Sequence, residues 1–281
     1  MVDRKYLLNS KQMAEFVHNG FLRFDALVPR DICDELYTFV DTQRHSRATA
    51  PSPFATAFPA DHPVMRAYSV PALQGAIQSL LGPNPTYDHH AAHRTAAGAK
   101  WQQALHQDAE YDTRFGSFDV QVSIFPQDTP REMGGTRFLP GSHFRRVYES
   151  EPGRYRNIRG MIQCECVAGT VVIWHHNLWH GAQPNATDTN RYMIKLRLNP
   201  TVRQQLLWDT RDLQDPDAMQ WLDKSHAWWG VESRLELMNK IRLWRSLTGQ
   251  PTFDRAMWWS RIETTPTTLY HRDQYSPLPA G

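Results

Sequence analysis

The sequence has few cysteines and no excess of charge of either sign. Its 281 residues include 3 cysteines, and an odd number in a long chain argues against a disulfide framework. Lysine and arginine total 31 against 29 aspartate and glutamate residues, so the chain lacks the basic field that nucleic acid or an anionic membrane attracts. We therefore expect neither a nucleic-acid partner nor a membrane partner.

Long hydrophobic runs are also missing. No stretch approaches the roughly 18 apolar residues of a membrane-spanning helix, and the N-terminal residues lack the apolar run of a signal peptide. The chain is nevertheless 41% hydrophobic and 11% aromatic, which is ample for a packed core. These features predict a cytoplasmic globular protein, either a monomer or a homodimer.

A histidine and a carboxylate separated by one residue carry the strongest chemical signal. His106 and Asp108 would project from the same face of an extended strand, so they can offer a nitrogen and an oxygen to one point. One more imidazole, for which we choose His180, would complete three ligands on one face of an octahedron. Non-haem Fe(II) oxygenases use that arrangement because oxygen and a cosubstrate need the open positions.

An arginine follows the second histidine at the start of a strand-like segment. Arg191 precedes residues 192–198, in which apolar and polar residues alternate as they do in a strand. A guanidinium at this place can donate two parallel hydrogen bonds to a dicarboxylate bound at the metal. Arg191 is therefore a candidate for binding a cosubstrate.

The sequence at these residues resembles the phytanoyl-CoA dioxygenase family of Fe(II)- and 2-oxoglutarate-dependent oxygenases. The resemblance runs from about Gln12 to about Pro200. It rests on His106-Gln107-Asp108, on the segment MGGTRFLPGSH at 133–143, and on Trp179-His180-Gly181 with Asn185 and Arg191. It implies that His106, Asp108 and His180 hold Fe(II) and that Arg191 binds the distal carboxylate of 2-oxoglutarate.

Three further details concern the same resemblance. The number of residues between His180 and Arg191 fits the family pattern, which favours His180 as the distal metal ligand over His175, the second choice. If His175 is not a ligand, it would hydrogen-bond to one. Ala182 departs from the family, which often has a hydroxyl residue two positions after the distal histidine. The family also often has a basic residue in the strand before the metal ligands, so Arg94 becomes a second cosubstrate candidate, with a surface arginine as the alternative.

Two other polar groups compete for a role near the metal. His89 and His93 share one face of the predicted strand 87–95 and form a rival metal cluster, although no carboxylate stands at a matching offset. In the segment 118–125, Gln121 and Ser123 alternate with apolar residues. Gln121 would hydrogen-bond to the dicarboxylate if this polar face lines the mouth of a barrel. If the face is exposed to solvent, Gln121 would be an ordinary surface residue.

The pattern of elements predicts a mainly β fold with flanking helices. Many short strands with turns at regular intervals fit a double-stranded β-helix, the jelly roll that cupins share. We expect one domain over residues 1–281, with N-terminal helices and a lid loop at 1–85, the jelly-roll core at 86–200, and a helical extension at 201–281. Predicted helices cover about 11–19, 30–44, 70–81 and 233–247, and predicted strands cover 21–24, 87–95, 118–125, 164–175 and 192–198.

Two segments have an unusual composition. Residues 46–63 are rich in proline, alanine and threonine without a period, which predicts a long loop that is either a mobile lid or a disordered insertion. The extension at 201–281 holds most of the 10 tryptophans. These tryptophans would line a substrate pocket, form a subunit contact, or pack onto the outer face of the barrel.

The resemblance implies an enzyme that uses Fe(II), 2-oxoglutarate and O2. It would couple decarboxylation of 2-oxoglutarate to succinate with oxidation of a small-molecule metabolite, by default a hydroxylation. Asp108 argues against halogenation, because halogenases of this class lack the carboxylate ligand. The alternatives are a cupin-like metalloenzyme that does not use 2-oxoglutarate, which Arg191 disfavours, and a non-catalytic relative that binds a ligand.

Overall fold

The computed structural model describes residues 2–42, 46–108, 117–145, 152–226 and 230–255. Its strands are β1 (Phe21–Phe24), β2 (Ser46–Pro53), β3 (Thr86–Thr95), β4 (Val120–Phe125), β5 (Arg137–Phe138), β6 (Ile162–Gln163), β7 (Thr170–His175), β8 (His180–Gly181) and β9 (Arg191–Asn199). Its α-helices are α1 (Ser10–Asn19), α2 (Arg30–Thr42), α3 (Pro63–Tyr68), α4 (Pro71–Leu81), α5 (Pro216–Asp223) and α6 (Val231–Thr248). Short 3-10 helices are η1 (Arg4–Tyr6), η2 (Phe54–Thr56), η3 (Arg131–Met133), η4 (Ser142–Phe144), η5 (Pro152–Arg154) and η6 (Thr210–Asp212).

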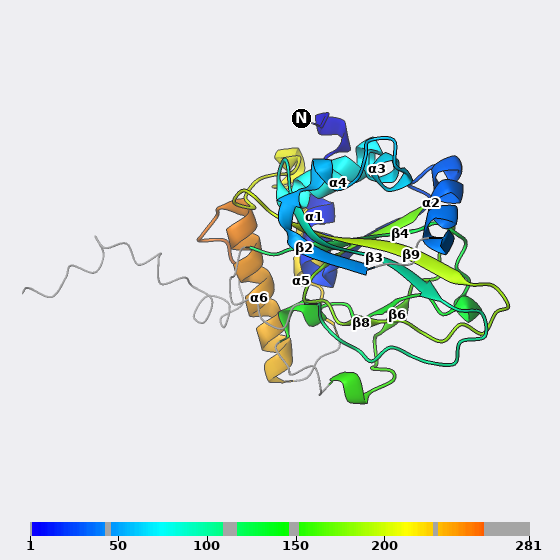
Figure 1. Cartoon of the computed structure of the whole chain (residues 1–281). Coiled ribbons are helices and arrows are strands. Elements are labelled where there is room, and N and C mark those ends of the chain that lie inside the picture. The colour runs from blue at the N-terminus through cyan, green and yellow to red at the C-terminus, as the bar shows by residue number, and fades with distance from the viewer. Residues whose placement is uncertain (1, 43–45, 109–116, 146–151, 227–229, 256–281) are drawn as a thin grey trace, which may run out of the picture.

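The strands form two antiparallel sheets. The larger sheet has the order β1-β7-β4-β9-β3-β2, and the smaller has the order β6-β5-β8. The smaller sheet lies below the larger one in Figure 1, whereas α1, α3 and α4 lie above it. This arrangement confirms the predicted jelly-roll fold, mainly β with flanking helices.

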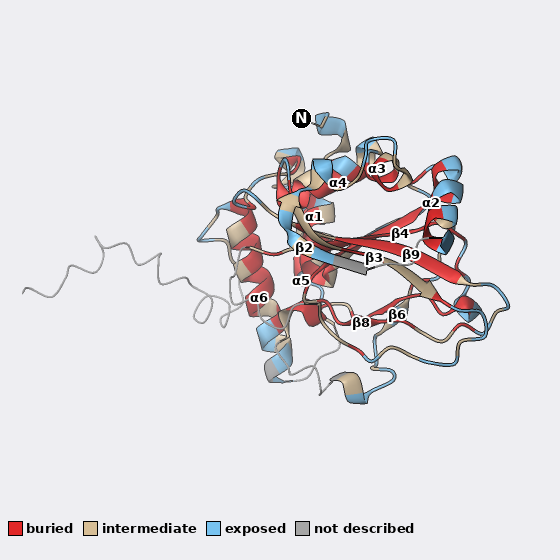
Figure 2. Cartoon of the chain, viewed as in Figure 1, coloured by how far each residue is buried: buried red, intermediate tan, exposed pale blue. Residues whose placement is uncertain are grey.

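The central strands bury both of their faces, because helices cover one and the smaller sheet covers the other (Figure 2). Alternate residues of β4, such as Val122 and Ile124, pack with the helices in the main core. On the opposite face Trp174 and Met193 pack against Phe138 of the smaller sheet. The other alternate side chains of β4 and β9 therefore point into the space between the two sheets.

The first helix shows how local sequence sets these elements. Asn9 caps α1: its side chain accepts from the Gln12 N–H at 2.9 Å, and the Gln12 side chain accepts from the Asn9 N–H at 3.1 Å. Gly20 ends the helix with φ 81°. The Ser10 hydroxyl accepts a hydrogen bond from Trp208 Nε1 at 3.0 Å, which ties the C-terminal region to α1.

Residues 46–63 are not the continuous loop that their composition predicts. Ser46–Pro53 forms β2, an edge strand paired with β3 on one side, with an irregular register between Ala48 and Ser52. Short helical turns at η2 and α3 follow. None of the residues 46–63 lines the cavity beside the predicted metal ligands, so the structure does not support a lid at this place.

The C-terminal region packs against the N-terminal helices. Trp208 and Trp244 are buried in the main core, and Trp221 packs at its edge. None of these three lines the cavity near the predicted ligands, so they fit the packing alternative for the tryptophan-rich segment. Trp228, Trp229, Trp258 and Trp259 lie outside the described residues. Among the residues described, no helix combines the length and the apolar character needed to cross a lipid bilayer.

A glycine in α4 allows η1 to lie against that helix. A Cβ atom at Gly75 would stand 1.9 Å from the Tyr6 carbonyl oxygen. Gly75→Ala gains about 1 kcal/mol of helix propensity, but the clash should outweigh it and destabilise the fold by about 1 to 3 kcal/mol net. Urea denaturation measures the change. Gln74→Ala, at an exposed position of the same helix, should stay within about 0.5 kcal/mol of the parent; equal stability of the Gly75→Ala variant would contradict the close approach.

Candidate metal centre

The structure brings the three predicted metal ligands together. The ligand atoms of His106, Asp108 and His180 all lie within 4.8 Å of one another. Nε2 of His180 is 3.4 Å from Oδ2 of Asp108, and Nε2 of His106 is 3.8 Å from Oδ1 of the same carboxylate. Two nitrogens and one oxygen thus surround a single point between the sheets.

The backbone holds the two histidines side by side, although not through the strand that the sequence predicts. His106 lies outside the named strands and forms an isolated antiparallel bridge with His180. Each N–H donates to the other residue's carbonyl oxygen, at 3.1 and 3.0 Å. Directly paired residues project their side chains to the same face, which places the ring centroids 4.4 Å apart. The Asp108 N–H donates to the His176 carbonyl oxygen at 3.2 Å and fixes the next residue of this segment.

The remaining ring nitrogens fix the tautomer of both histidines. Nδ1 of His106 is 3.0 Å from the Ala104 carbonyl oxygen, and Nδ1 of His180 is 2.9 Å from the Leu178 carbonyl oxygen. A carbonyl oxygen only accepts, so each Nδ1 carries the proton and donates. Each Nε2 therefore presents its lone pair toward Asp108, as a metal ligand requires.

The electrostatic surroundings keep Asp108 and His106 in the forms that bind a metal. Burial alone would raise the pKa of Asp108, but His180 and the Lys195 ammonium hold that pKa well below its usual range. Burial and the neighbouring His180 lower the pKa of His106 to about 4, so the imidazole is neutral at physiological pH. Two imidazole nitrogens and one carboxylate oxygen form a donor set that fits Fe(II).

A second group of possible ligands lies between α1 and α6. His18, His226 and Glu236 also bring ligand atoms within 4.8 Å of one another. The ammonium of Lys240, however, is 3.3 Å from Glu236 Oε1 and 3.4 Å from His18 Nδ1. None of these three residues lines the cavity beside the triad, and the ammonium of Lys240 approaches both the carboxylate and an imidazole of the group, so we interpret it as a buried ion-pair network that joins α6 to α1.

A cavity of about 130 Å³ opens beside the triad. Its lining residues come from both sheets and from the segment before His106: His93, Arg94, Thr95, Trp101, Gln103, His106, Thr136, Trp174, His180, Ala182, Arg191, Met193 and Lys195. Small-molecule sites usually measure about 300 to 1,000 Å³, so the described walls fit a compact ligand. Trp101, 52% exposed, stands among these lining residues and leaves part of its ring open to solvent.

Arg191 occupies the cavity wall as the sequence predicts. Its Nη2 donates to Thr95 Oγ1 at 2.6 Å, whereas its Nη1 is buried and has no partner among the described residues. Burial lowers the pKa of Arg191 to about 10, which still leaves the guanidinium charged at neutral pH. A buried guanidinium without a carboxylate partner is costly, so this group fits an anionic ligand such as a dicarboxylate.

The other two predicted cosubstrate residues are placed differently. Gln121 points into the space between the sheets, 1% exposed and with Oε1 unpartnered in the described chain, but it does not line the cavity. Arg94 borders the cavity, yet it pairs in register with Tyr192, whose side chain lies in the main core, and its Nη2 donates to Asn190 Oδ1 at 3.2 Å. Its guanidinium therefore turns away from the interior, and a cosubstrate role for Arg94 is not supported.

The rival histidines do not complete a metal site in the described part of the chain. His175 lies on the helix-covered face of β7, with its ring centroid 5.1 Å from that of Phe118, so it cannot be the distal ligand. His89 and His93 do face the interior, opposite Arg197 and Met193. His93 lines the cavity, and burial lowers its pKa to about 3, so it is a neutral wall of the site.

Sequence reasoning missed two polar residues at the centre. Lys195 Nζ donates to Asp108 Oδ2 at 2.9 Å. It stands four positions after Arg191 on β9, so the alternation of that strand was a signal that both residues share a face. Gln103 Nε2 lies 3.4 Å from His106 Nε2, and Gln103 Oε1 accepts from the Ala182 N–H at 3.2 Å. Nothing in the spacing of the sequence points to Gln103.

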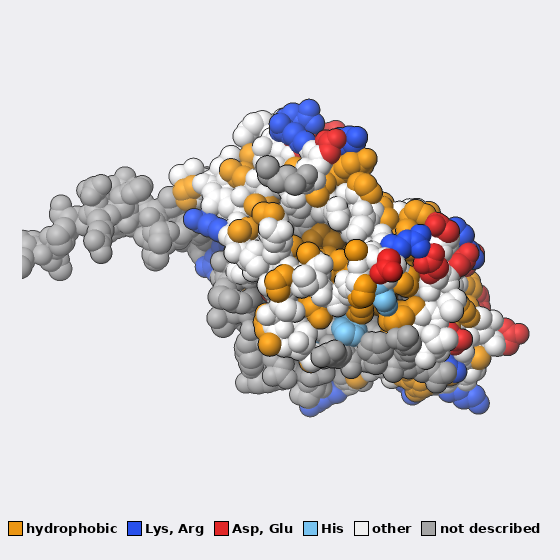
Figure 3. All heavy atoms as spheres, turned by 45° about the horizontal axis from the view of Figure 1, so that its top comes forward, with side chains coloured by type: hydrophobic (Ala, Val, Ile, Leu, Met, Phe, Trp, Pro, Cys, Tyr) orange, Lys and Arg blue, Asp and Glu red, His pale blue; other side chains and the backbone are white. Residues whose placement is uncertain are grey.

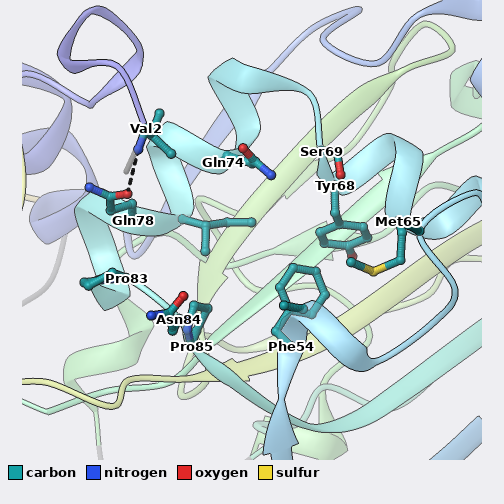
Figure 4. A pocket seen from close by; sticks show the side chains of 14 residues that line it. Val2, Phe54, Met65, Tyr68, Ser69, Gln74, Gln78, Pro83, Asn84 and Pro85 are labelled. Atoms are coloured by element: carbon teal, nitrogen blue, oxygen red, sulfur yellow. Dashed lines mark hydrogen bonds between the residues drawn. The ribbon is translucent and has the colours of Figure 1, made fainter.

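A larger cavity of about 570 Å³ lies elsewhere, between α3, α4 and η2. Figure 3 turns this helical side forward and shows hydrophobic side chains gathered there, and Figure 4 shows Phe54, Met65 and Tyr68 together along the wall. Gln78 accepts from the Val2 N–H at 3.4 Å at one end. The lining contains no charged residue and no histidine or cysteine, so this cavity offers no ligands for a metal.

Comparison with known proteins agrees with this geometry. The model of the phytanoyl-CoA dioxygenase family (PhyH) matches residues 16–193. Two curated relatives, the proteins Mb1539 of Mycobacterium bovis and Rv1501 of Mycobacterium tuberculosis, are each 26% identical over 137 residues. Those residues make up 48% of this chain and 48% of each relative, so the chain spans about half the length of the curated relatives it matches.

Solved structures with the same fold include one with 2-oxoglutarate bound and one of an α-ketoglutarate-dependent epimerase. HygX from Streptomyces hygroscopicus, with nickel and 2-oxoglutarate bound, has a TM-score of 0.55 and 14% identity over 74% of this chain and 94% of its own. The α-ketoglutarate-dependent epimerase SnoN from nogalamycin biosynthesis has a TM-score of 0.53 and 16% identity over 68% of this chain and 83% of its own. At these identities the likeness confirms the fold.

Proposed function

Because the chain belongs to the phytanoyl-CoA dioxygenase family, we propose that it is a non-haem iron oxygenase that uses 2-oxoglutarate. In this proposal it couples decarboxylation of 2-oxoglutarate to oxidation, most often hydroxylation, of a small-molecule metabolite. One observation carries the proposal: the three candidate metal ligands meet beside one small cavity, which is lined by His106, His180 and the buried guanidinium of Arg191, whose Nη1 has no partner among the described residues. We also propose that residues 1–281 form one cytoplasmic domain, a monomer or a homodimer.

In this proposal each residue of the site has a defined role. His106, Asp108 and His180 would hold Fe(II), which when bound supplies the activation of O2 and the oxidative decarboxylation of 2-oxoglutarate to succinate and carbon dioxide. Arg191 would bind the distal carboxylate of 2-oxoglutarate, with Thr95 holding the guanidinium in place at 2.6 Å. HygX, which has the same fold and binds nickel and 2-oxoglutarate, supports this assignment.

The cavity walls would keep water away from the reacting atoms. Trp174 and Met193 are buried between the sheets and line the cavity, and Ala182 adds a methyl group near the distal histidine. Apolar walls strengthen the charge interactions inside the site and limit side reactions with water. Ala182 also leaves Arg191 and Thr95 as the polar groups that would hold the distal carboxylate.

The alternatives make different demands on the same residues. A cupin-like metalloenzyme without 2-oxoglutarate would leave the buried Nη1 of Arg191 unpaired during turnover. A non-catalytic relative would have no need for two neutral imidazoles and a carboxylate aimed at one point. Both alternatives are therefore less consistent with the geometry than a 2-oxoglutarate-dependent oxygenase.

Succinate formation tests the proposal. Protein reconstituted with Fe(II) is incubated with 2-oxoglutarate and O2, alone and with a panel of small metabolites, and succinate is quantified. We expect slow succinate formation without a metabolite, a stimulated rate with the right one, and neither in the Asp108→Ala variant, because it lacks a metal ligand. An iron-loaded parent that forms no more succinate than the variant under all conditions would refute the proposal.

A further inference from the structure

A buried lysine shares the carboxylate that would bind the metal. Lys195 stands on the interior face of β9, lines the cavity and is 6% exposed. Its only partner in the described chain is Asp108, through Nζ and Oδ2 at 2.9 Å. An ammonium has three N–H groups, so donors remain for an anion in the cavity.

Among the described residues, the site around Asp108 holds more positive than negative charge. Besides Lys195, the guanidinium of Arg191 is buried there, and its one hydrogen-bond partner in the described chain is Thr95 Oγ1. Arg137, 1% exposed on β5, donates to the Gln103 carbonyl oxygen and to the Asn157 side chain, and it has no carboxylate partner in the described residues. A divalent metal ion alone would add two more positive charges to this buried region, whereas 2-oxoglutarate would bring two negative ones.

We propose that Lys195 acts as a counter-cation of Asp108 that opposes binding of a metal ion alone and makes metal and 2-oxoglutarate bind as a coupled pair. The inference rests on the proposed function and specifies how that site is loaded. A metal ion must approach a carboxylate whose charge an ammonium already offsets, in an interior where charges interact more strongly than in water. The two negative charges of 2-oxoglutarate then offset the positive charge of both the metal ion and the Lys195 ammonium.

Coupling of this kind is reciprocal. If 2-oxoglutarate tightens metal binding by some factor, the metal tightens 2-oxoglutarate binding by the same factor. A different role for Lys195, holding Asp108 in place by a hydrogen bond, makes the opposite prediction. Loss of an outer-sphere hydrogen-bond partner usually weakens metal binding about 10- to 100-fold. The direction of the change therefore separates the two roles.

The test measures metal affinity with and without 2-oxoglutarate. Ni(II), which replaces Fe(II) without reacting with O2, is titrated against a chromophoric chelator in the full-length protein. Lys195→Met removes the charge and keeps the length of the side chain, and Lys195→Arg keeps the charge. Arg197→Met is the matched control, because Arg197 is also a cation on the interior face of β9 paired with a carboxylate, Asp119 at 2.6 Å, but does not line the cavity. Circular dichroism confirms that each variant is folded.

We expect Lys195→Met to bind Ni(II) alone at least tenfold more tightly than the parent. The factor by which saturating 2-oxoglutarate tightens Ni(II) binding should fall at least tenfold in the same variant. Lys195→Arg and the Arg197→Met control should behave like the parent. Ni(II) binding by Lys195→Met that is equal to or weaker than that of the parent would overturn the inference, and so would an unchanged effect of 2-oxoglutarate.

Failure of the proposed function gives a different result. A protein that does not use 2-oxoglutarate would show no tightening of Ni(II) binding by the cosubstrate in the parent itself. The comparison of Ni(II) affinities without 2-oxoglutarate would still decide whether Lys195 opposes the metal.

Discussion

Arg191→Ala is expected to weaken 2-oxoglutarate binding by about 100-fold or more while the metal stays bound. The buried Nη1 has no partner among the described residues, and a bidentate pair with a carboxylate loses two charge-assisted hydrogen bonds of about 1.5 to 3 kcal/mol each when the guanidinium is removed. The metal ligands do not contact Arg191 through any hydrogen bond of the structure, so their geometry should be preserved. Calorimetric titration of 2-oxoglutarate into the Ni(II)-loaded protein measures the loss.

Two variants on the same strand sharpen this test. Arg191→Lys keeps the charge but loses the planar fork, so it should recover only part of the affinity. Arg197 faces the same interior but donates to Asp119 at 2.6 Å, and it does not line the cavity, so Arg197→Ala should bind 2-oxoglutarate nearly as the parent does. If Arg197→Ala lost 2-oxoglutarate binding while Arg191→Ala kept it, Arg197 and not Arg191 would bind the distal carboxylate, and the assignment would be wrong.

The second large effect concerns the metal itself. Loss of a residue that hydrogen-bonds to a metal ligand typically lowers metal affinity about 10- to 100-fold. His180→Ala removes a ligand itself, so it should lower metal affinity by more than that. The fold should persist, because the main core of apolar residues packs on the other face of the larger sheet. Atomic spectroscopy of the purified protein measures iron content, and circular dichroism checks the fold.

His175→Ala is the control for this assignment. His175 is buried against Phe16 and Phe118 on the opposite face of the sheet, so its loss should leave the iron content unchanged. The reverse result, in which His175→Ala loses iron and His180→Ala keeps it, would show that the distal ligand was assigned wrongly.

The sequence predicted the metal site because ligand chemistry depends on few residues. Spacing suggested His106 and Asp108, the family resemblance added His180 with His175 as the second choice, and the structure brings the first three together. The prediction that His106 lies in an extended strand was wrong, since a single bridge between His106 and His180 aligns the two rings. A backbone bridge between distant residues depends on tertiary pairing, which no local pattern contains.

The edge strand β2 was missed for a physical reason. Its sequence, SRATAPSP, has neither the β-branched runs nor the alternation that predict a strand. An edge strand pairs on one side only, so prolines are tolerated where no hydrogen bond to a neighbour is needed. Pairing with β3 therefore imposes extended structure on a segment whose own composition favours a loop.

Two neighbouring errors concern which face of a strand a side chain occupies. Arg94 and Lys195 both stand in segments whose strand character was predicted. Arg94 was named as a candidate and faces the main core side, whereas Lys195 was not named and reaches Asp108. The pairing of β3 with β9 sets these directions, and a shift by one residue would exchange them. Register is a property of the assembled sheet, so the sequence of one strand did not decide it.

The measurement that tests the central claim most directly is a titration of 2-oxoglutarate into the Fe(II)-loaded protein without oxygen. Chelation of Fe(II) by 2-oxoglutarate produces a visible charge-transfer band. We expect a saturable band in the parent, a band that requires at least about 100-fold more 2-oxoglutarate in Arg191→Ala, and none in Asp108→Ala. An Fe(II)-loaded parent that develops no band at saturating 2-oxoglutarate would contradict the account and favour a cupin-like metalloenzyme.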